Sequence, residues 1–326
     1  MPIETPTSIS RRAALSRALM AATTMTLGAT LARGALAQTA KDAPKDPQKT
    51  SNAAARLAEL ERKNGGLLGV AALNLATGAR IGHRNAERFP MCSTFKLLAG
   101  AFVLSRVDRG QERLDRRIVY GKDKLIPYAP VAEKHADGSG LTVAELCHAA
   151  ITLSDNVAAN LLLESFGGPA ALTAWLRSIG DEVTRLDRWE PELNEGAPGD
   201  PRDTTTPDAM LDTMRRTLFG DALSEASRKQ LADWAVATST GGKRLRAGFP
   251  ADWRAGDKTG TGQRGMTNDI AVAWPAKEGP VKEGPVKEGP AKGGPLLVTA
   301  YYRDSTIPAA QRDAVIAEVG RIAVGV

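Results

Sequence analysis

Residues 91–104, MCSTFKLLAGAFVL, form the stretch that decides the fold. They contain the one Ser-x-x-Lys pattern of the chain, Ser93-Thr94-Phe95-Lys96, at the start of an apolar run with helical spacing. Residues three apart share a helix face, so the amine of Lys96 can reach the hydroxyl of Ser93. Free backbone N–H groups and the helix dipole at a helix N-terminus favour a developing oxyanion. The stretch predicts a buried helix that begins with a nucleophilic serine or, in the simpler alternative, a helix cap and a solvated lysine.

Outward from this stretch, strand signals lie near both ends of the chain and helical signals lie between them. The segments with strand patterning are 67–73, 79–83, 270–274 and 296–302. The segments predicted as flanking helices are 51–64 and 308–323. This order predicts a mixed α/β fold. A discontinuous lobe of sheet and helices (51–89 and 235–326) holds an all-helical lobe (90–234).

The N-terminus predicts an export signal. Residues 1–37 place Arg11-Arg12 ahead of a modestly apolar stretch and end in small residues, which is typical of a twin-arginine signal. The alternative is a basic tail. The stretch is too short and interrupted for a stable membrane anchor, so we expect a folded protein in the periplasm. Residues 38–50 predict a flexible leader.

The charge of the chain does not predict a basic surface that would bind nucleic acid. The chain of 326 residues carries a net +6, of which residues 1–37 contribute +3, and aromatic residues make up 5%. Mild, scattered charge and few aromatics disfavour a nucleic-acid surface. We expect a monomer that binds small molecules.

A low-complexity segment interrupts the C-terminal part. Residues 276–295 repeat a five-residue unit with Gly and Pro, which sustains neither a helix nor a strand ladder. The segment lies between two predicted strands, so it is expected to be an extended, solvated hairpin loop. A partner-binding role is the alternative.

The sequence contains no local motif for binding a metal ion or a cofactor. The three histidines, His83, His135 and His148, form no metal-binding spacing with one another or with cysteine, and we expect structural or surface roles for them. No Gly-x-Ser-x-Gly elbow or phosphate-binding glycine loop is present either. The sequence therefore predicts no metal and no cofactor.

Three further motifs accompany the Ser-x-x-Lys pattern. Ser154-Asp155-Asn156 interrupts a helical region, Lys258-Thr259-Gly260-Thr261-Gly262 begins a predicted strand, and Glu190-Pro191-Glu192-Leu193-Asn194 lies between the two. Taken singly, they could be a helix cap, an exposed strand start and a surface carboxylate. Taken together and in this order, they favour a shared site.

Ser-x-x-Lys, Ser-Asp-Asn and Lys-Thr-Gly at these separations resemble the class A β-lactamases, from about residue 52 to the C-terminus. Residues 190–194 match the family's Ω-loop motif, and we call residues 188–203 the Ω-loop. The resemblance implies a lobe of antiparallel sheet flanked by helices, with an all-helical lobe. It also implies hydrolysis of the β-lactam ring of penicillins and cephalosporins through a serine acyl-enzyme, which confers antibiotic resistance.

Residue roles follow from the resemblance. Ser93 would be the nucleophile, with Lys96 as its proton acceptor or electrostatic partner. Glu190 would act as general base on the hydrolytic water, and Ser154 would relay a proton to the lactam nitrogen. Backbone N–H groups of Ser93 and Thr261 would form the oxyanion hole. The residues implied in binding substrate or water are Asn156, Asn194, Lys258, Thr259, Thr261, Arg244 and Tyr128. Arg188 and Asp203 would close the Ω-loop as an ion pair.

The cysteines depart from the family pattern. Cys92 resembles the cysteine that carbapenem-hydrolysing members place before the nucleophile, but its counterpart here is Gly262. Cys147 resembles half of a second family disulfide, whose other half is Gly100. Neither bridge is expected, which argues against strong carbapenem hydrolysis and suits export after folding in a reducing cytoplasm.

Two other readings share the nucleophile, the second serine and the Lys-Thr-Gly triplet. One is a serine D-alanyl-D-alanine peptidase or other penicillin-binding protein, against which Glu190 and Asn194 argue. The other is a penicillin-sensing domain, acylated and then inert, for which no membrane span or signalling domain is visible.

Overall fold

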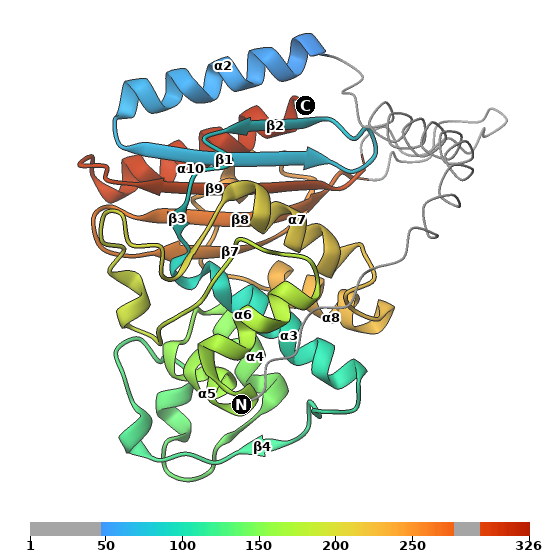
Figure 1. The fold of residues 1–326 in the computed structure, drawn as a ribbon, viewed down its shortest axis with the longest axis vertical. Coiled ribbons are helices and arrows are strands. Elements are labelled where there is room, and N and C mark those ends of the chain that lie inside the picture. Colours follow the sequence, from blue (N-terminus) through green and yellow to red (C-terminus); the bar gives the residue numbers. More distant parts are fainter. Residues whose placement is uncertain (1–46, 277–293) are drawn as a thin grey trace, which may run out of the picture. The chain divides into compact units, whose positions relative to one another are not determined.

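The computed structural model describes residues 47–276 and 294–326 (Figure 1). The predicted export signal, most of the predicted leader and most of the repeat lie outside these described residues. Within them, no helix is both long enough and apolar enough to cross a membrane.

A five-stranded antiparallel sheet in the order β2-β1-β9-β8-β7 forms the centre of one lobe. The strands are β1 (Leu67–Asn74), β2 (Arg80–His83), β7 (Arg254–Thr261), β8 (Thr267–Trp274) and β9 (Leu296–Arg303). The first two come from the N-terminal part of the chain and the other three from the C-terminal part. The discontinuous α/β fold with its antiparallel sheet is therefore confirmed.

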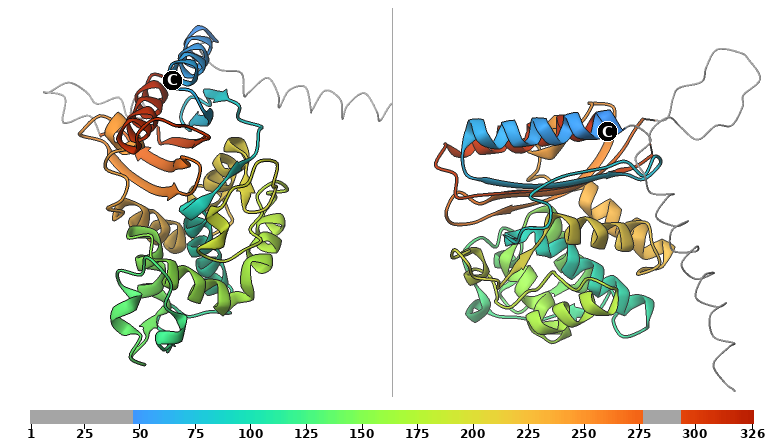
Figure 2. Two further views of the ribbon diagram at one scale, coloured as in Figure 1. Left: turned by 90° about the vertical axis from the view of Figure 1, so that its left-hand side faces the viewer. Right: turned by 45° about the horizontal axis from the view of Figure 1, so that its top comes forward.

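Helices α2 and α10, from opposite ends of the described chain, cover one face of the sheet (Figures 1 and 2), and the short α9 packs with them. These helices are α2 (Pro47–Asn64), α9 (Leu245–Gly248) and α10 (Ala309–Val324). Leu57 of α2 and Ile316 of α10 share a hydrophobic core with Val70 of β1, whereas the adjacent Ala71 belongs to the core on the other face. Successive side chains of a strand alternate between its two faces, so β1 contributes to both cores.

The other core lies between the sheet and the helices and extends through the all-helical lobe. Its helices are α3 (Phe95–Asp108), α4 (Val143–Thr152), α5 (Asn156–Phe166), α6 (Gly168–Ser178), α7 (Pro207–Leu218) and α8 (Glu225–Val236). Helix α3 is buried along almost its whole length, which explains its apolar sequence. The short strand pairs are β3 (Phe89–Pro90) with β6 (Thr204–Thr205) and β4 (Arg117–Ile118) with β5 (Leu141–Thr142).

Three predicted boundaries were wrong by three residues or more. Strand β8 begins at Thr267 rather than Ile270, because residues 267–269 also pair with β7 and β9. Helix α2 begins at Pro47 rather than Ser51, because its first turn reaches beyond the apolar pattern, whose first buried side chain is Ala53. Residues 47–50 of the predicted leader are thus helical. Strand β7 begins at Arg254, which pairs with Trp274, so Lys258 lies within the strand and not at its start. Lys258 is fully buried, and the alternative of an exposed strand start is therefore wrong.

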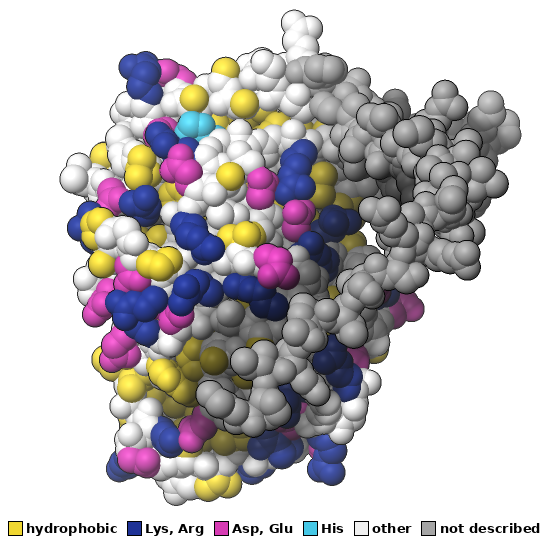
Figure 3. Space-filling model, in the orientation of Figure 1, with side chains coloured by type: hydrophobic (Ala, Val, Ile, Leu, Met, Phe, Trp, Pro, Cys, Tyr) yellow, Lys and Arg dark blue, Asp and Glu magenta, His cyan; other side chains and the backbone are white. Residues whose placement is uncertain are grey.

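One face of the molecule is drawn as a surface in Figure 3. Lys and Arg side chains are interspersed there with Asp and Glu side chains. No field of a single sign dominates this face.

Candidate active site

Ser93 lies in a tight turn at the entrance to α3. The 3₁₀ turn Cys92–Thr94 leads directly into the helix, and Cys92 has a φ of 47° in the left-handed region. The turn packs against β7 so closely that a Cβ on Gly260 would come within 2.7 Å of the carbonyl oxygen of Met91. A glycine at this position therefore allows the strand to approach the nucleophile.

Lys96 and Glu190 form a fully buried ion pair beside Ser93. The Lys96 Nζ to Glu190 Oε1 distance is 2.9 Å, and the Ser93 hydroxyl donates to the same Oε1 at 3.1 Å. No direct Ser93–Lys96 hydrogen bond occurs within the described residues, in contrast to the expectation from helix spacing. The reason is that the carboxylate lies between the two groups and bonds to both.

The remaining bonds of Lys96 lead to the Ser154-Asp155-Asn156 motif. Its Nζ donates to the carbonyl oxygen of Ser154 at 2.8 Å and to Asn156 Oδ1 at 2.6 Å. Burial lowers the pKa of Lys96, and the Glu190 carboxylate opposes this shift. With a longer contact of 3.5 Å to Ser154 Oγ, the amine is thus held by four oxygens in a site that disfavours its charge.

Ser154 occupies the break between α4 and α5 with a φ of 61°. Asp155 explains the break, because its side chain accepts from the backbone N–H groups of Ala158, Val131 and Ala132. It caps α5 and anchors the neighbouring loop, which is a structural role.

Lys258 approaches Ser154 from the sheet. Its Nζ donates to Ser154 Oγ at 3.0 Å and to the carbonyl oxygen of Thr259 at 2.8 Å. Burial and the nearby charge of Lys96 lower the pKa of Lys258 to about 7. The structure thus brings Ser93, Lys96, Ser154, Glu190 and Lys258 together; we call them the serine–lysine cluster.

Glu190 is held by the Ω-loop and by a residue that the sequence analysis missed. Asn194 Nδ2 donates to Glu190 Oε2 at 2.5 Å. Asn160 bonds to the Glu190 backbone at both the N–H and the carbonyl, at 3.0 and 2.9 Å. Asn160 stands one helical turn after Asn156 on α5, so the i, i+4 spacing of two asparagines was the available signal.

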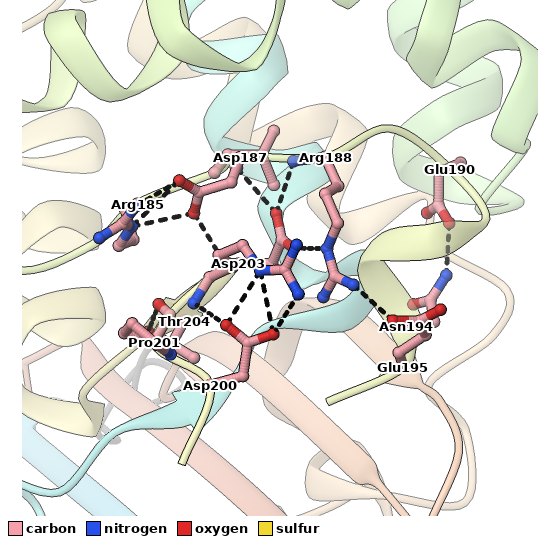
Figure 4. A network of polar contacts seen from close by, with 12 residues as sticks. Arg185, Asp187, Arg188, Glu190, Asn194, Glu195, Asp200, Pro201, Asp203 and Thr204 are labelled. Atoms are coloured by element: carbon pink, nitrogen blue, oxygen red, sulfur yellow. Dashed lines mark hydrogen bonds and ion pairs between the residues drawn. The ribbon is translucent and has the colours of Figure 1, made fainter. Parts of the chain in front are cut away.

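A network of ion pairs closes the base of the Ω-loop (Figure 4). We call Arg185, Asp187, Arg188, Asp200, Arg202 and Asp203 the Ω-loop network. The Arg188 Nε to Asp203 Oδ2 distance is 2.6 Å, which confirms the expected pair. Asp203 Oδ1 also accepts from the backbone N–H groups of Asp187 and Arg188. One buried carboxylate thus joins the two ends of the loop.

Arg244 reaches the end of β7 beside the motif threonines. Its Nη2 donates to Thr261 Oγ1 at 2.8 Å, and its Nε pairs with Asp313 of α10 at 2.8 Å. Thr259 bonds through its hydroxyl to Thr240 at 2.8 Å. Asp313 is a second residue that the sequence analysis missed, because it lies far away in the chain within an unremarkable helix.

Tyr128 lies outside this buried group. Its side chain is 60% exposed, and its backbone has a φ of 67°. Its carbonyl oxygen accepts from the backbone N–H of Asn156, which fixes the loop against α5. An aromatic ring is thereby presented at the surface next to the Asn156 backbone.

The two cysteines are free and buried. A Cβ built on Gly262 would lie 2.8 Å from Cys92 Sγ, so this glycine does face the thiol as expected. Burial raises the pKa of the Cys92 thiol, and its sulfur instead contacts Met266. Near Gly100, the closest side chain is Ile151.

The histidines lie away from the serine–lysine cluster. His83 contacts Glu61, His135 contacts Ser139, and His148 contacts Thr152. No group of three or more His, Cys, Asp or Glu residues suited to a metal ion occurs in residues 47–276 and 294–326.

A serine next to buried lysines and a carboxylate, on a sheet lobe joined to a helical lobe, defines a serine acyl-transfer enzyme. The chain matches the model of the "Beta-lactamase enzyme family" over residues 52–282. It is 48% identical to "Beta-lactamase L2" of Stenotrophomonas maltophilia over 93% of this chain and 94% of that protein. It is 51% identical to "Beta-lactamase FAR-1" of Nocardia farcinica over 68% of this chain and 71% of that protein.

The comparison with solved structures indicates the same family. An "Ancestral (GNCA) Beta-lactamase class A" is 66% identical with a TM-score of 0.77, and the match covers 83% of this chain and 98% of that one. The "Putative Class A Beta-Lactamase PenP from Rhodopseudomonas palustris" is 55% identical with a TM-score of 0.78, over 84% of this chain and 99% of that one. The chain belongs to the class A β-lactamases, as its motifs predicted, and it is a hydrolase of the β-lactam ring.

Proposed function

We propose that the enzyme opens the β-lactam ring of penicillins and cephalosporins with Ser93 as nucleophile and hydrolyses the resulting ester with a water held by Glu190. The main support for this proposal is the position of the Glu190 carboxylate. Its Oε1 bonds to both Ser93 Oγ and Lys96 Nζ, and its Oε2 bonds to Asn194. The same carboxylate therefore contacts both the nucleophilic hydroxyl of Ser93 and the buried amine of Lys96.

In the acylation step, Ser93 Oγ forms a bond to the lactam carbonyl carbon. The hydroxyl proton passes to the Lys96–Glu190 pair, and the lowered pKa of Lys96 supports its role as acceptor. Backbone N–H groups of Ser93 and Thr261 stabilise the oxyanion. The carbon–nitrogen bond then breaks, and Ser154 gives its proton to the departing nitrogen with support from Lys258 at 3.0 Å. Ser154 regains a proton from Lys96, whose Nζ lies 3.5 Å from its Oγ, so the Lys96–Glu190 pair is free again for deacylation.

In the deacylation step, Glu190 takes a proton from a water that attacks the ester carbonyl. Asn194 supplies the second hydrogen bond to that water. The Ser93–carbonyl bond breaks, the proton returns to Ser93, and the opened product carries a new carboxylate. Asn160 fixes the backbone of Glu190 and so acts as a positioning residue.

Substrate binding uses groups around the serine–lysine cluster. Asn156 holds the side-chain amide of the substrate, and Tyr128 packs at the rim. Lys258, Thr259, Thr261 and Arg244 bind the substrate carboxylate. The direct bond from Arg244 to Thr261 supports a shared carboxylate subsite, which favours broad use of cephalosporins.

The test of this proposal is Glu190→Ala with a good penicillin and with a chromogenic cephalosporin. Because no other motif carboxylate serves the water, turnover should fall by about 10²–10⁴-fold. Mass spectrometry should detect one equivalent of acyl-enzyme on Ser93. Ser93→Ala is the control and should show neither adduct nor turnover. Parent-rate turnover in Glu190→Ala, or an adduct on another residue, would refute the assigned roles.

Export, oligomeric state and lobe boundaries complete the proposal. The enzyme acts as a monomer in the periplasm without a stable membrane anchor, with lobes at residues 51–89 plus 235–326 and residues 90–234. The Arg11-Arg12 pair in the N-terminal segment supports export by the twin-arginine route. Replacement of both arginines with lysine should leave activity in the cytoplasm, and unchanged periplasmic activity would contradict the route.

A further inference from the structure

A small pocket lies between the Ω-loop and the rest of the protein. Its volume is about 230 Å³, and its walls come from loop residues 196–201 and from Arg88, Pro90, Thr204 and Arg303. Figure 4 shows Asp200, Pro201 and Thr204 on the opposite side of the Arg188–Asp203 pair from Glu190. The pocket is thus separate from the serine–lysine cluster but shares the loop that holds Glu190.

Arg88 brings an uncompensated charge to this pocket. Its Nη1 donates to the carbonyl oxygen of Val183 and to Thr204 Oγ1, each at 3.0 Å. Both acceptors are neutral, and the guanidinium has no carboxylate partner among the described residues. Arg88 is exposed overall, and these two bonds from Nη1 hold one end of its guanidinium beside the pocket while the other N–H groups remain available.

Arg303 brings a second guanidinium with an unused donor. It is paired with Asp304, and its Cζ lies 5.4 Å from the ring centroid of Phe89. Its Nε is buried and has no hydrogen-bond partner within the described part of the chain. Because this Nε has almost no accessible area, the Nη2 group, which makes no hydrogen bond within the described part of the chain, is the donor left for a ligand in the pocket.

The acidic groups around the pocket do not neutralise these two arginines. Asp200 lines the pocket, but both of its oxygens accept from Arg202, at 2.7–3.0 Å. Asp304 is shared between Arg303 and Arg264. After these pairings the positive charge of Arg88 remains in excess.

We propose that this pocket binds a small oxyanion of the carboxylate or phosphate class. Guanidinium groups pair with such oxyanions through two parallel N–H bonds, and these charge-assisted bonds are the strongest that arginine makes. A volume near 230 Å³ suits a few heavy atoms rather than a drug-sized molecule. A bound anion would connect residues 196–201 to Arg88 and Arg303, and would therefore hold the Ω-loop against β3 and β9.

The test uses inorganic phosphate as the probe, with chloride at equal ionic strength as the reference. Hydrogen exchange of the backbone amides in residues 196–201 should slow as phosphate is added and should reach saturation. The cations Lys258 and Arg244 also attract anions, so protection of the amides of β7 is recorded separately and is expected to be unaffected by changes at the new pocket.

Arg88→Gln and Arg303→Gln should each weaken the phosphate protection of residues 196–201 at least about tenfold. Arg113→Gln is the matched control, because Arg113 is an exposed arginine whose partner is Asp115. Arg88→Gln also removes bonds to Val183 and Thr204, whereas Arg303→Gln leaves them, so the second variant separates anion binding from loosening of the loop. Equal protection in the parent and in Arg303→Gln, or no protection at about 100 mM phosphate, would overturn the proposal.

Discussion

Two groups of ion pairs involve the Ω-loop, one around the fully buried Lys96–Glu190 pair and one partly exposed, and they use different cations. The serine–lysine cluster contains Lys96 and Lys258, both fully buried. The Ω-loop network contains only arginines as cations (Figure 4). A buried lysine shifts its pKa readily, whereas an arginine keeps its charge and offers a rigid fork of donors. The lysines of the serine–lysine cluster are therefore suited to changing protonation state, and the arginines of the Ω-loop network are suited to holding the loop.

The pKa of Lys258 in the serine–lysine cluster and the pKa of Arg188 in the Ω-loop network shift in opposite directions. Burial lowers the pKa of Lys258 to about 7. Burial also disfavours the charge of Arg188, but the hydrogen-bonded Asp203 carboxylate outweighs it and raises the pKa of Arg188. The network is thus insensitive to pH around neutrality. The cluster is poised to exchange protons there.

The largest expected effect comes from Lys96→Arg. The guanidinium keeps the positive charge at every accessible pH, so it cannot accept a proton from Ser93. We expect kcat/KM to fall by at least about 10³-fold, with the loss in the rate of acyl-enzyme formation measured by rapid mixing.

Lys96→Met accompanies this experiment, because arginine is larger than the buried lysine that it replaces. The methionine variant removes both the charge and the proton acceptor, and it should lose activity to a similar degree. If folded Lys96→Arg kept near-parent activity while Lys96→Met lost it, Lys96 would act through its charge alone.

Lys258→Met should stabilise the protein and abolish most of its activity. In the parent, the folded-state pKa of Lys258 is about 7, below the value of about 10.4 expected after unfolding. Between these two values the unfolded state binds more protons, so the parent gains stability as the pH rises. The advantage of the variant is therefore largest below about pH 7. It should shrink by about 2 kcal/mol between pH 7.5 and pH 9.

Urea unfolding of both proteins at several pH values measures this difference. A gap in the free energy of unfolding that stays constant across this range would show that Lys258 remains charged in the folded state. Lys229→Met is the control, since Lys229 is an exposed lysine paired with Asp233.

The sequence predicted the parts of the fold and site that depend on neighbours in the chain. The Thr-x-x-Glu spacing of Thr142 and Glu145 is typical of a capping box, and this box forms at the start of α4. Ser154 likewise occupies a break between two helices. Four motifs in order were enough to indicate the class A β-lactamase fold. Each of these signals depends on a spacing of a few residues.

The parts that the sequence analysis missed depend on distant contacts. Asn160 bonds to Glu190 thirty residues away, and Asp313 pairs with an arginine sixty-nine residues away. The shared position of Glu190 Oε1 between Ser93 and Lys96 also results from loop closure. Spacing along a helix could not reveal that a carboxylate from another segment would occupy this place.

A smaller effect is expected from Arg188→Lys in the Ω-loop network. The arginine reaches Asp203 through Nε and Glu195 through Nη1, and a single ammonium cannot reproduce this fork. Because a positive charge remains, we expect a loss of only about 1 kcal/mol in the free energy of unfolding. Deacylation should slow more than acylation, and presteady-state kinetics separate the two. A slower acylation with unchanged deacylation would show that the network supports the nucleophile rather than Glu190.

The smallest effect is expected from the repeat, which belongs to neither ion-pair group. It follows β8, whose last residue Trp274 pairs with Arg254, four positions before Lys258 on β7. At about 3.4 Å per residue, this end of the sheet is roughly 14 Å from Lys258. Deletion of residues 276–290 keeps Pro295, whose carbonyl oxygen accepts from the backbone N–H of Leu75 at 2.9 Å.

Closure entropy grows only slowly with the length of a connection, so shortening the link between β8 and β9 should change the free energy of unfolding by less than about 1 kcal/mol. We expect kcat/KM for penicillins and cephalosporins to stay within a few-fold of the parent. A folded deletion variant that loses turnover by a large factor would show that residues 276–290 reach the active site. The ion pairs of the Ω-loop and of the serine–lysine cluster would then be insufficient to define the working enzyme.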